Sequence, residues 1–492
     1  MSAKTEEAGS WIALATLMLA TVLANIATVC MFPLIVTLSQ QFGRPVNQVV
    51  WTLVGYGVVA TGVGGVASGL GAALGNRRML AVALVLLLVG SLIAALSTDL
   101  PLLIVGRVFQ GVCLSIQALA MGIVANYWRG PAMRRAMTLI MASVGGGSIV
   151  AYLLSGFIAR SGGDWRIVFW ILVGASAVDL LLSLLFLKET PRTQGVRLDY
   201  AGCIGLIGWS VLLLLPLSQA NSWGWGSGKV LGQLIAGAAL VVVWVFWELR
   251  CRAPLIDLRV LRPRGAWQGA VTWLFISMAV CVPPTIVPYL VETPVASGFG
   301  FGRSLFAVCM VLMTTSLVMA FFPLGVTRLL GALGSKWTMF LGLLLGLGGF
   351  GLAFAHGSLW LVVMWLACTG TMPAIAGSAA YVLGNEAVRP EQGILISTIY
   401  NTAAGVGASV ASAAAGYIMT VRTVAVQVST GGGLETQRFP ADQTFTWSAL
   451  LVGGAAVAGM LVALTIRTGR MQPVVLTQPR PLPSLSFRAN DT

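Results

Sequence analysis

The sequence predicts an all-α integral membrane protein of about 14 transmembrane helices, arranged as two six-helix bundles plus two inserted helices. Two observations carry this prediction. The 492-residue chain is 57% hydrophobic and only 9% charged, whereas ordinary globular domains carry about 25% charged residues. The few charged residues also stand almost entirely between long apolar stretches. A soluble domain of this length would need far more charged surface.

The apolar stretches define the spans in order. Stretches without Asp, Glu, Lys or Arg cover residues 8–43, 45–76, 79–98, 136–159, 200–228, 265–291, 304–327, 392–421 and 443–466. Each can supply the roughly 20 apolar residues that cross a hydrocarbon core about 30 Å thick. With the shorter apolar stretches added, the predicted spans are 11–35, 48–70, 79–97, 101–127, 136–159, 167–187, 200–219, 229–248, 267–291, 304–327, 337–355, 359–384, 393–421 and 445–466.

Several connections follow from local composition. The charge-free run 337–385 is too long for one span, and Ala355-His356-Gly357-Ser358 reads as the turn that divides it, with His356 a loop residue. The first span lacks a preceding basic segment and a small-residue cleavage site, so we expect it to be retained and not to be a signal peptide. Residues 422–444 form the longest exposed loop, on the outer face. The Pro-rich tail 469–492 has no helical period and is predicted to be disordered.

Basic residues give the orientation. On one predicted face lie seven of the 29 Lys and Arg residues: Arg44, Arg160, Arg166, Lys229, Arg303, Arg422 and Arg438. The other face carries 21, and Arg107 lies inside a span. The positive-inside rule makes the richer face cytoplasmic. We therefore expect a cell (plasma or inner) membrane protein with both termini in the cytoplasm. The net charge of +14 then meets anionic lipid headgroups, and no nucleic-acid partner is expected.

No motif indicates a cofactor, a metal or an enzyme. The seven Cys residues show no metal-ligand or disulfide spacing and read as small core residues. The chain has no phosphate-binding loop of the Gly-x-x-x-x-Gly-Lys-Ser/Thr kind, which argues against ATP as the energy source. We therefore predict no metal, no cofactor and no enzymatic activity.

Two parts of the chain share local features. The turn of residues 71–77 after the second span is similar to residues 331–336 after the tenth, because both are glycine turns that end in cations. Gly147, Ala151 and Ser155 in the fifth span are spaced like Gly405, Ser409 and Ala413 in the thirteenth, and such small residues let helices approach closely. Repeated bundles around a midplane site are typical of secondary transporters. Glycine-rich helices can also resemble one another without being repeats.

This comparison predicts four parts of the chain. They are an N-terminal six-helix bundle over 1–190, a two-helix insertion with cytoplasmic loops over 191–265, a C-terminal six-helix bundle over 266–468, and the cytoplasmic tail 469–492.

Several short motifs, in this order and spacing, resemble the 14-helix drug:proton antiporter branch of the major facilitator superfamily, and the likeness covers nearly the whole chain. The motifs are Trp51 and Tyr56, the loop from Gly69 to Arg78, Arg107-x-x-Gln110-Gly111, Asp164-Trp165-Arg166, Asp199-Tyr200-Ala201-Gly202, Trp223-Gly224-Trp225, Glu248-Leu249-Arg250 and Pro254-Leu255-Ile256-Asp257-Leu258. The resemblance implies the major facilitator fold and multidrug or antibiotic efflux by a monomer. It also implies a set of residues that act in the conformational change: Gly69, Gly75, Arg77, Arg78, Gly147 and Gly156.

Arg107 is the most informative single residue. It lies about two turns inside the fourth span, where a guanidinium is costly unless it faces a partner or a wet cavity. The resemblance makes it the arginine that takes part in proton and substrate handling, beside a watery passage between the bundles. The alternative is a structural cation bonded to carbonyls of the first span.

The sequence departs from the resemblance at three places. The family's acidic residue in the first span is missing from Ala24-Asn25-Ile26-Ala27-Thr28, and Asn25 cannot carry a proton. In the loop after the second span, the acidic and basic positions are Ala72 and Ala73. In the fifth span, Ala151-Tyr152 replaces Gly-Pro, and only Gly156 remains of the later glycine pair. These departures bear on proton coupling more than on transport itself.

Few acidic residues could replace the missing carboxylates. Asp179 lies near the middle of the sixth span, where the charged form of a carboxylate is disfavoured, a useful property for a proton carrier. Helix packing is the competing interpretation. Glu292 ends the ninth span on the outer side and could bind protons or substrate, or be a solvated helix end. The proton-coupling candidates are therefore Arg107, Asp179 and Glu292.

Polar and aromatic residues inside the spans are candidates for binding substrate: Asn25, Tyr56, Gln110, Gln117, Tyr400 and Asn401. Numerous Met and Phe residues favour an apolar, adaptable pocket, although core packing would use the same residues. We predict export of lipophilic or amphipathic small molecules by alternating access, coupled to protons. The alternatives are an uncoupled or lipid-handling member and a relative that no longer transports. We expect the partners to be the substrate, protons and membrane lipids.

Overall fold

The structure is a computed structural model that describes residues 3–44, 46–189, 199–251, 254, 256–352, 357–388, 392–430 and 433–466. The predictions for His356 and for the tail 469–492 fall outside the described residues.

Helices account for almost all of the described chain. The first part contains α1 (Ala3–Val29), α2 (Met31–Phe42), α3 (Val46–Val49), α4 (Trp51–Leu74), α5 (Asn76–Leu96), α6 (Leu100–Gln110), η1 (Gly111–Cys113), α7 (Leu114–Tyr127), α8 (Gly130–Ser161) and α9 (Arg166–Phe186). The middle part contains α10 (Tyr200–Trp223), α11 (Gly228–Arg250) and η2 (Leu258–Leu261). The last part contains α12 (Arg264–Cys281), α13 (Pro283–Glu292), η3 (Val295–Ser297), α14 (Leu305–Phe321), α15 (Pro323–Leu352), α16 (Leu359–Thr371), the π-helical turn η4 (Met372–Gly377), α17 (Ser378–Glu386), α18 (Gly393–Val421) and α19 (Asp442–Leu464).

The helices are long and apolar enough for a multi-pass integral membrane protein. Among the described residues, 12 helical segments reach the length and hydropathy of a membrane span, and two shorter apolar segments cover Trp51–Val63 and Leu305–Phe321. Each of the predicted spans overlaps one of these segments. The all-helical membrane class is therefore confirmed, whereas the count of 14 spans stays a prediction.

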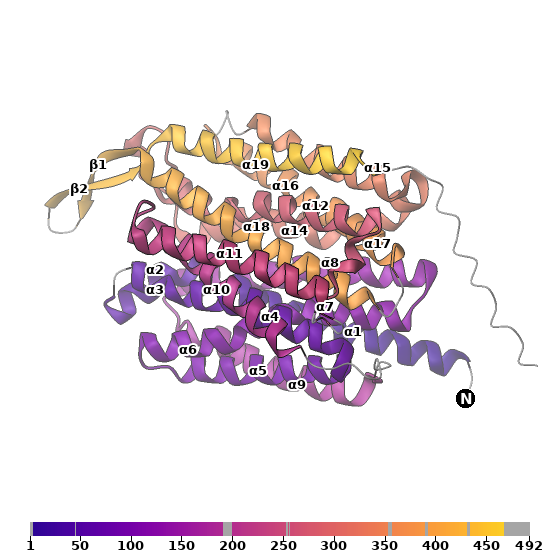
Figure 1. Cartoon of the computed structure of the whole chain (residues 1–492). Coiled ribbons are helices and arrows are strands. Elements are labelled where there is room, and N and C mark those ends of the chain that lie inside the picture. Colours follow the sequence, from indigo (N-terminus) through magenta and orange to yellow (C-terminus); the bar gives the residue numbers. More distant parts are fainter. Residues whose placement is uncertain are drawn as a thin grey trace, which may run out of the picture.

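The same helix pairings recur in the first and last parts of the chain. In the first part, α1 packs against α8 and α9, and α5 packs against α9. In the last part, α12 packs against α18 and α19, and α15 packs against α19. The pairings match helix for helix, and the predicted boundaries of the two bundles stay a prediction. Below, the first half means α1–α9 and the second half means α12–α19. Figure 1 shows the indigo and purple helices of the first half beneath the orange and yellow helices of the second.

The inserted pair lies against both halves. Helices α10 and α11 pack on each other, and α10 also contacts α4 and α18. At one end of the pair, Asp199 caps α10 by accepting a hydrogen bond from the Gly202 amide at 2.8 Å. The Trp247 indole donates to the same carboxylate at 3.1 Å. The second contact joins the Asp199-Tyr200-Ala201-Gly202 motif to the residue just before the Glu248-Leu249-Arg250 motif.

The two halves meet mainly along four helix pairs: α8 with α14, α7 with α18, α4 with α18 and α8 with α15. Glycine permits the closest approaches. A Cβ atom on Gly145 of α8 would overlap the backbone of Met319 and Ala320 in α14, and one on Gly405 of α18 would lie 2.7 Å from Thr61 Oγ1 in α4. Gly405 belongs to a small-residue stripe predicted from sequence, and this member of the stripe lies at the interface between the halves.

The two predicted glycine turns both require a backbone that only glycine adopts easily. Gly75, between α4 and α5, has φ +102°, and Gly334, at a kink inside α15, has φ +75°. In this left-handed region a side chain is strained. The turns therefore match in conformation as well as in sequence.

One outer connection differs from the prediction. Residues 422–444 were expected to form an exposed loop, but they contain a β-hairpin of β1 (Thr423–Thr430) and β2 (Gly433–Pro440), paired antiparallel from Thr423↔Pro440 to Thr430↔Gly433. The alternation of Val424, Val426 and Val428 suits a strand. The hairpin lies at one end of the bundle in Figure 1, and the N-terminus and the end of α19 lie at the other. We call these the predicted outer end and the predicted cytoplasmic end.

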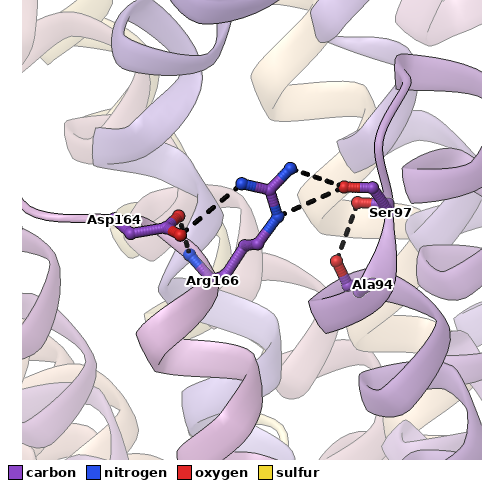
Figure 2. A network of polar contacts seen from close by, with 4 residues as sticks. All are labelled: Ala94, Ser97, Asp164 and Arg166. Carbon is purple, nitrogen blue, oxygen red and sulfur yellow. Dashed lines mark hydrogen bonds and ion pairs between the residues drawn. The ribbon is translucent and has the colours of Figure 1, made fainter.

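A polar clamp joins α5 to α9 at the predicted outer end (Figure 2). The Arg166 guanidinium donates two hydrogen bonds to the Ser97 carbonyl, at 2.7 and 3.2 Å. Asp164 lies 3.5 Å from the same guanidinium and accepts from the Arg166 amide at 3.0 Å. Since Ser97 caps the C-terminal end of α5, the clamp places a cation where the helix dipole is negative.

Candidate functional site

Arg107 lies fully buried in α6, at 0% exposure. Its Nη1 donates to the Ala27 carbonyl of α1 at 2.7 Å and to Gln110 Oε1 at 2.6 Å, and its Nε donates to the Thr52 carbonyl of α4 at 3.4 Å. The other terminal nitrogen, Nη2, has no hydrogen-bond partner among the described residues. In this conformation the guanidinium therefore does not border an open passage. It is held by carbonyls of α1 and α4, as in the alternative interpretation.

Tyr56 lies against the guanidinium of Arg107. The ring centroid is 4.5 Å from the guanidinium carbon, a distance that gives a cation–π attraction. The Tyr56 hydroxyl is 2.5 Å from Thr28 Oγ1 and 3.2 Å from Cys113 Sγ. These contacts link α4 to α1 and to the 3-10 turn η1, and they hold the ring in place.

Gln110 extends the cluster to a further helix. Its Nε2 donates to Ser91 Oγ of α5 at 2.8 Å, while its carbonyl oxygen accepts from Arg107. Every hydrogen-bond partner of Arg107 that the structure describes is neutral. A permanently charged, desolvated side chain thus lies in the first half without a carboxylate against it, which is costly unless a ligand or another state supplies an acceptor.

Two other predicted binding residues of the first half lie apart from this cluster. Asn25 Nδ2 donates to the Thr21 carbonyl of its own helix at 3.1 Å and makes no hydrogen bond to Arg107. Gln117 Nε2 lies 3.5 Å from Met141 Sδ and so links α7 to α8. The structure therefore brings Tyr56 and Gln110 to Arg107, but neither Asn25 nor Gln117.

The second half contains an aromatic and polar cluster of its own. The Tyr381 hydroxyl donates to Asn401 Oδ1 at 2.7 Å, and the Tyr400 hydroxyl donates to the Ala266 carbonyl at 3.1 Å. Ring centroids lie 5.3 Å apart between Tyr381 and Tyr400, and 5.1 Å apart between Tyr381 and Trp273. The predicted residues Tyr400 and Asn401 thus lie close together.

Trp273 and Tyr381 are members of this cluster that were not predicted. Trp273 lies more than two turns inside α12, away from the interfacial belt where Trp and Tyr usually anchor a helix, and that position was the available signal in the sequence. Tyr381 lies five residues before the end of α17, where the sequence contains no such signal.

Asp179 is fully buried in α9. Neither of its carboxylate oxygens has a hydrogen-bond partner among the described residues, and the same holds for the Ser183 hydroxyl one turn later. No hydrogen bond or ion pair joins it to Arg107 in the described part of the chain. Its helix packs against α1 and α5 inside the first half, so a role in coupling remains a prediction.

Glu292 ends α13 at the predicted outer end, and its side chain is exposed. Thr293, which follows, is buried. The exposed position fits the alternative of a solvated helix end, and a role in proton or substrate binding stays a prediction.

Four of the six predicted conformational residues lie at the predicted cytoplasmic end of the first half. Gly69 lies in α4, Gly75 forms the turn, and the Arg77 guanidinium donates to the Leu184 carbonyl of α9. Arg78 Nε lies 3.5 Å from Glu189 Oε2. The remaining two pack elsewhere: a Cβ on Gly147 would lie 2.6 Å from the Val22 carbonyl of α1, and one on Gly156 would lie 3.1 Å from Cys309 Cβ of α14.

Glu189 was not predicted to belong to this group. Its carboxylate lies where a Cβ atom of Gly75 would be, next to the N-terminus of α5, whose first turn has no acidic residue. A carboxylate at this position is stabilised by the positive end of the helix dipole. Since the loop itself has Ala72 and Ala73, the negative charge comes from the segment after α9 instead.

One ion pair joins the halves at the predicted cytoplasmic end. Arg134 Nη1 of α8 donates to Glu386 Oε1 of α17 at 3.0 Å, and the two side chains are 40% and 22% exposed. It is the one ion pair between the halves within the described ranges.

Comparisons with known proteins agree with this architecture. The family model described as Major Facilitator Superfamily matches residues 17–412. The transporter EfpA of Mycobacterium tuberculosis is 24% identical over 440 residues, covering 83% of this chain and 77% of EfpA. The multidrug transporter mfsC of Aspergillus fumigatus is 24% identical over 257 residues, covering 50% of this chain and 49% of mfsC. The chain spans about half the length of mfsC and of the Bacillus subtilis transporter YhcA.

The fold is also found in solved structures. The human organic anion transporter MFSD10 superposes with a TM-score of 0.63 at 15% identity, covering 92% of this chain and 99% of MFSD10. The nucleoside transporter NupG gives a TM-score of 0.55 at 13% identity, with coverage of 92% and 99%. With its family match over most of its length and its paired helical halves, the chain belongs to the Major Facilitator Superfamily of transporters.

Proposed function

We propose that the protein is a secondary active transporter that exports lipophilic or amphipathic small molecules by alternating access. The observation that carries this proposal is the interface between the halves. It consists of four main helix pairs, with close backbone approaches at Gly145 and Gly405 and a single ion pair at one end in the described ranges. Such an interface can open at either end while few polar contacts are broken.

The substrate class rests on chemistry. The candidate binding residues of both halves are neutral amides and tyrosines, and the helices around them are rich in Ala, Val, Leu and Met. Such surroundings favour apolar molecules that carry a few hydrogen-bond acceptors over sugars or phosphates. The relative mfsC is named a multidrug transporter, which is in line with this substrate class.

Proton coupling is the proposed source of energy, with Arg107, Asp179 and Glu292 as its candidates. Asp179 is supported by its burial without a hydrogen-bond partner, since such a carboxylate favours binding a proton. We further propose a monomer in the cell membrane with both termini in the cytoplasm, because the positively charged loops are predicted on that side.

The test is flux in proteoliposomes with and without a pH gradient, using a panel of lipophilic dyes and drugs. Wild type is expected to move several panel members, faster with the gradient than without it. Asp179→Asn is expected to remove the increase in flux that the pH gradient produces. Glu292→Gln tests the second candidate in the same way. If wild-type protein moves no panel member, the exporter proposal is wrong.

A second candidate is an uncoupled or lipid-handling transporter. The specific observation that favours it is Arg107, whose described partners are all neutral where a carboxylate would serve a proton relay. It predicts wild-type flux that is equal with and without the pH gradient, so the same experiment separates the two candidates.

A further inference from the structure

Trp273 is a buried hydrogen-bond donor without an acceptor. Its side chain is 9% exposed, and its indole Nε1 has no hydrogen-bond partner among the described residues. The indole group can only donate, and burying a donor without an acceptor is unfavourable. Among the other buried tryptophans, Trp244 donates to the Gly202 carbonyl at 2.9 Å, whereas Trp209 and Trp365 also have no described acceptor. Trp273 therefore lacks a contact that its chemistry calls for.

The ring of Trp273 is held in place by α17 and by the π-helical turn before it. A Cβ on Gly377 would lie 2.7 Å from the benzene edge of the indole, and the Tyr381 ring meets it at 63° with centroids 5.1 Å apart. The unpaired N–H consequently cannot turn freely to find an acceptor. Single π-helical turns within α-helices occur frequently at functional sites.

A second buried donor without a described acceptor lies on the other side of Tyr381, at Asn401. Asn401 accepts from the Tyr381 hydroxyl with its oxygen, while its Nδ2 has no hydrogen-bond partner among the described residues. The two unpaired donors come from α12 and α18, and Tyr381 contacts both residues, Trp273 through its ring and Asn401 through its hydroxyl. No described hydrogen bond or ring contact of these three side chains involves a charged group.

From this we infer a ligand-recognition site formed by Trp273, Tyr381 and Asn401, which we call the donor site. The ligand is a planar aromatic compound with a neutral hydrogen-bond acceptor, such as a ring carbonyl. Its acceptor receives the N–H of Trp273 and of Asn401, and its ring packs on the aromatic side chains. This inference rests on the proposed function and adds to it a substrate class and two residues, Trp273 and Tyr381, that select it.

A pair of probes with one skeleton isolates the acceptor. 9-Fluorenone is a planar ketone, and fluorene is the same skeleton without the carbonyl. We would measure saturable binding of tritiated 9-fluorenone to the purified full-length protein, with unlabelled fluorenone and fluorene as competitors. Wild type is expected to prefer fluorenone by about three- to tenfold, the effect of roughly one neutral hydrogen bond.

Trp273→Phe keeps an aromatic ring and removes the donor. We expect this variant to bind fluorenone and fluorene about equally. The matched control is Trp365→Phe, which removes another buried indole N–H without a described partner, 5% exposed and in α16, and which is expected to keep the wild-type preference. Asn401→Leu is the second variant, expected to reduce the preference as well, and it tests the site if Trp273→Phe fails to fold.

Four results would overturn the donor site. The first three are equal binding of both probes by wild type, an unchanged preference in both Trp273→Phe and Asn401→Leu, and an equal loss of preference in Trp365→Phe. Absence of saturable fluorenone binding to wild type would also overturn it. In each case flux of other lipophilic compounds in proteoliposomes would still support the proposed function, so the two claims fail separately.

Discussion

The two halves of the molecule bury different chemistry at corresponding helices. In the first half, the fourth span places Arg107 against α1 and α4, so a permanent charge lies among neutral acceptors. In the second half, the fourth span places Tyr381 between Trp273 and Asn401, so the cluster is aromatic and neutral. The same helix framework thus provides charge in one half and uncharged hydrogen-bond donors in the other. We infer that charge-dependent steps belong to the first half and recognition of the ligand's shape to the second.

The largest effect is expected from a substitution that removes the charge of the Arg107 cluster. Arg107→Leu should lower flux of every substrate by roughly 100-fold, which corresponds to the loss of about one hydrogen bond to a charged group, worth about 1.5–3 kcal/mol. Arg107→Lys keeps the charge but cannot reproduce the planar donor geometry, so it should fall between this variant and wild type. Initial rates in proteoliposomes measure both. An effect confined to some substrates would contradict the division of roles between halves.

The next largest effect concerns the buried carboxylate, which has no counterpart in the second half, since residues 443–466 contain no acidic residue. Asp179→Asn should reduce gradient-driven flux to the level seen without a gradient. Its unfolding temperature should stay close to wild type, because no hydrogen bond in the described structure is lost. Thermal unfolding and flux on the same preparation provide the check. Unchanged gradient dependence would remove Asp179 from the coupling mechanism.

The matched glycine turns sharpen the comparison through stability. An alanine at a left-handed position costs about 1–2 kcal/mol, which applies to both Gly75→Ala and Gly334→Ala. At Gly75 the added methyl also overlaps the Glu189 carboxylate, whereas nothing lies within 4 Å of the corresponding atom at Gly334. Gly75→Ala should therefore lower the unfolding temperature more. Adding Glu189→Ala to it should narrow the gap, and an equal effect of the two single changes would count against the placement of Glu189.

The smallest expected effect is at the ion pair between the halves. Because Arg134 and Glu386 are partly exposed, their interaction should contribute about 0.2–1 kcal/mol, or at most about a fivefold change in rate. A double-mutant cycle of Arg134→Gln and Glu386→Gln on flux rates measures the coupling. It should shrink at high salt, and a coupling that is insensitive to salt would indicate some other contact.

The sequence predicts local features of the fold well. Spans follow from hydropathy, and the turns at Gly75 and Gly334 follow from glycine beside cations, because both depend on neighbouring residues. The hairpin was missed although Val424, Val426 and Val428 alternate as in a strand, since hydropathy over long windows does not register such a short element.

The site was less predictable because it depends on contacts between distant segments. Tyr56 and Gln110, predicted as substrate-binding residues, lie beside Arg107, and their role stays a prediction. The partners Ala27 and Thr52 offer backbone carbonyls, which no side-chain pattern indicates. Glu189 reaches Gly75 only through the packing of α9 on α5. The expectation that Arg107 borders an open passage came from the resemblance. In the structure the guanidinium is fully buried and bonded to the carbonyls of Ala27 and Thr52.

Reversible cross-linking of the halves tests the central claim most directly. A Cβ on Gly393 of α18 would lie 2.8 Å from the Ala125 Cβ of α7 at the predicted cytoplasmic end, close to the range of about 3.5–4.5 Å that a disulfide needs. In the Ala125→Cys, Gly393→Cys protein, oxidation should stop dye flux and reduction should restore it, with wild type and each of the two single variants unaffected by the same treatment. Undiminished flux through a fully cross-linked protein would contradict transport by separation of the two halves.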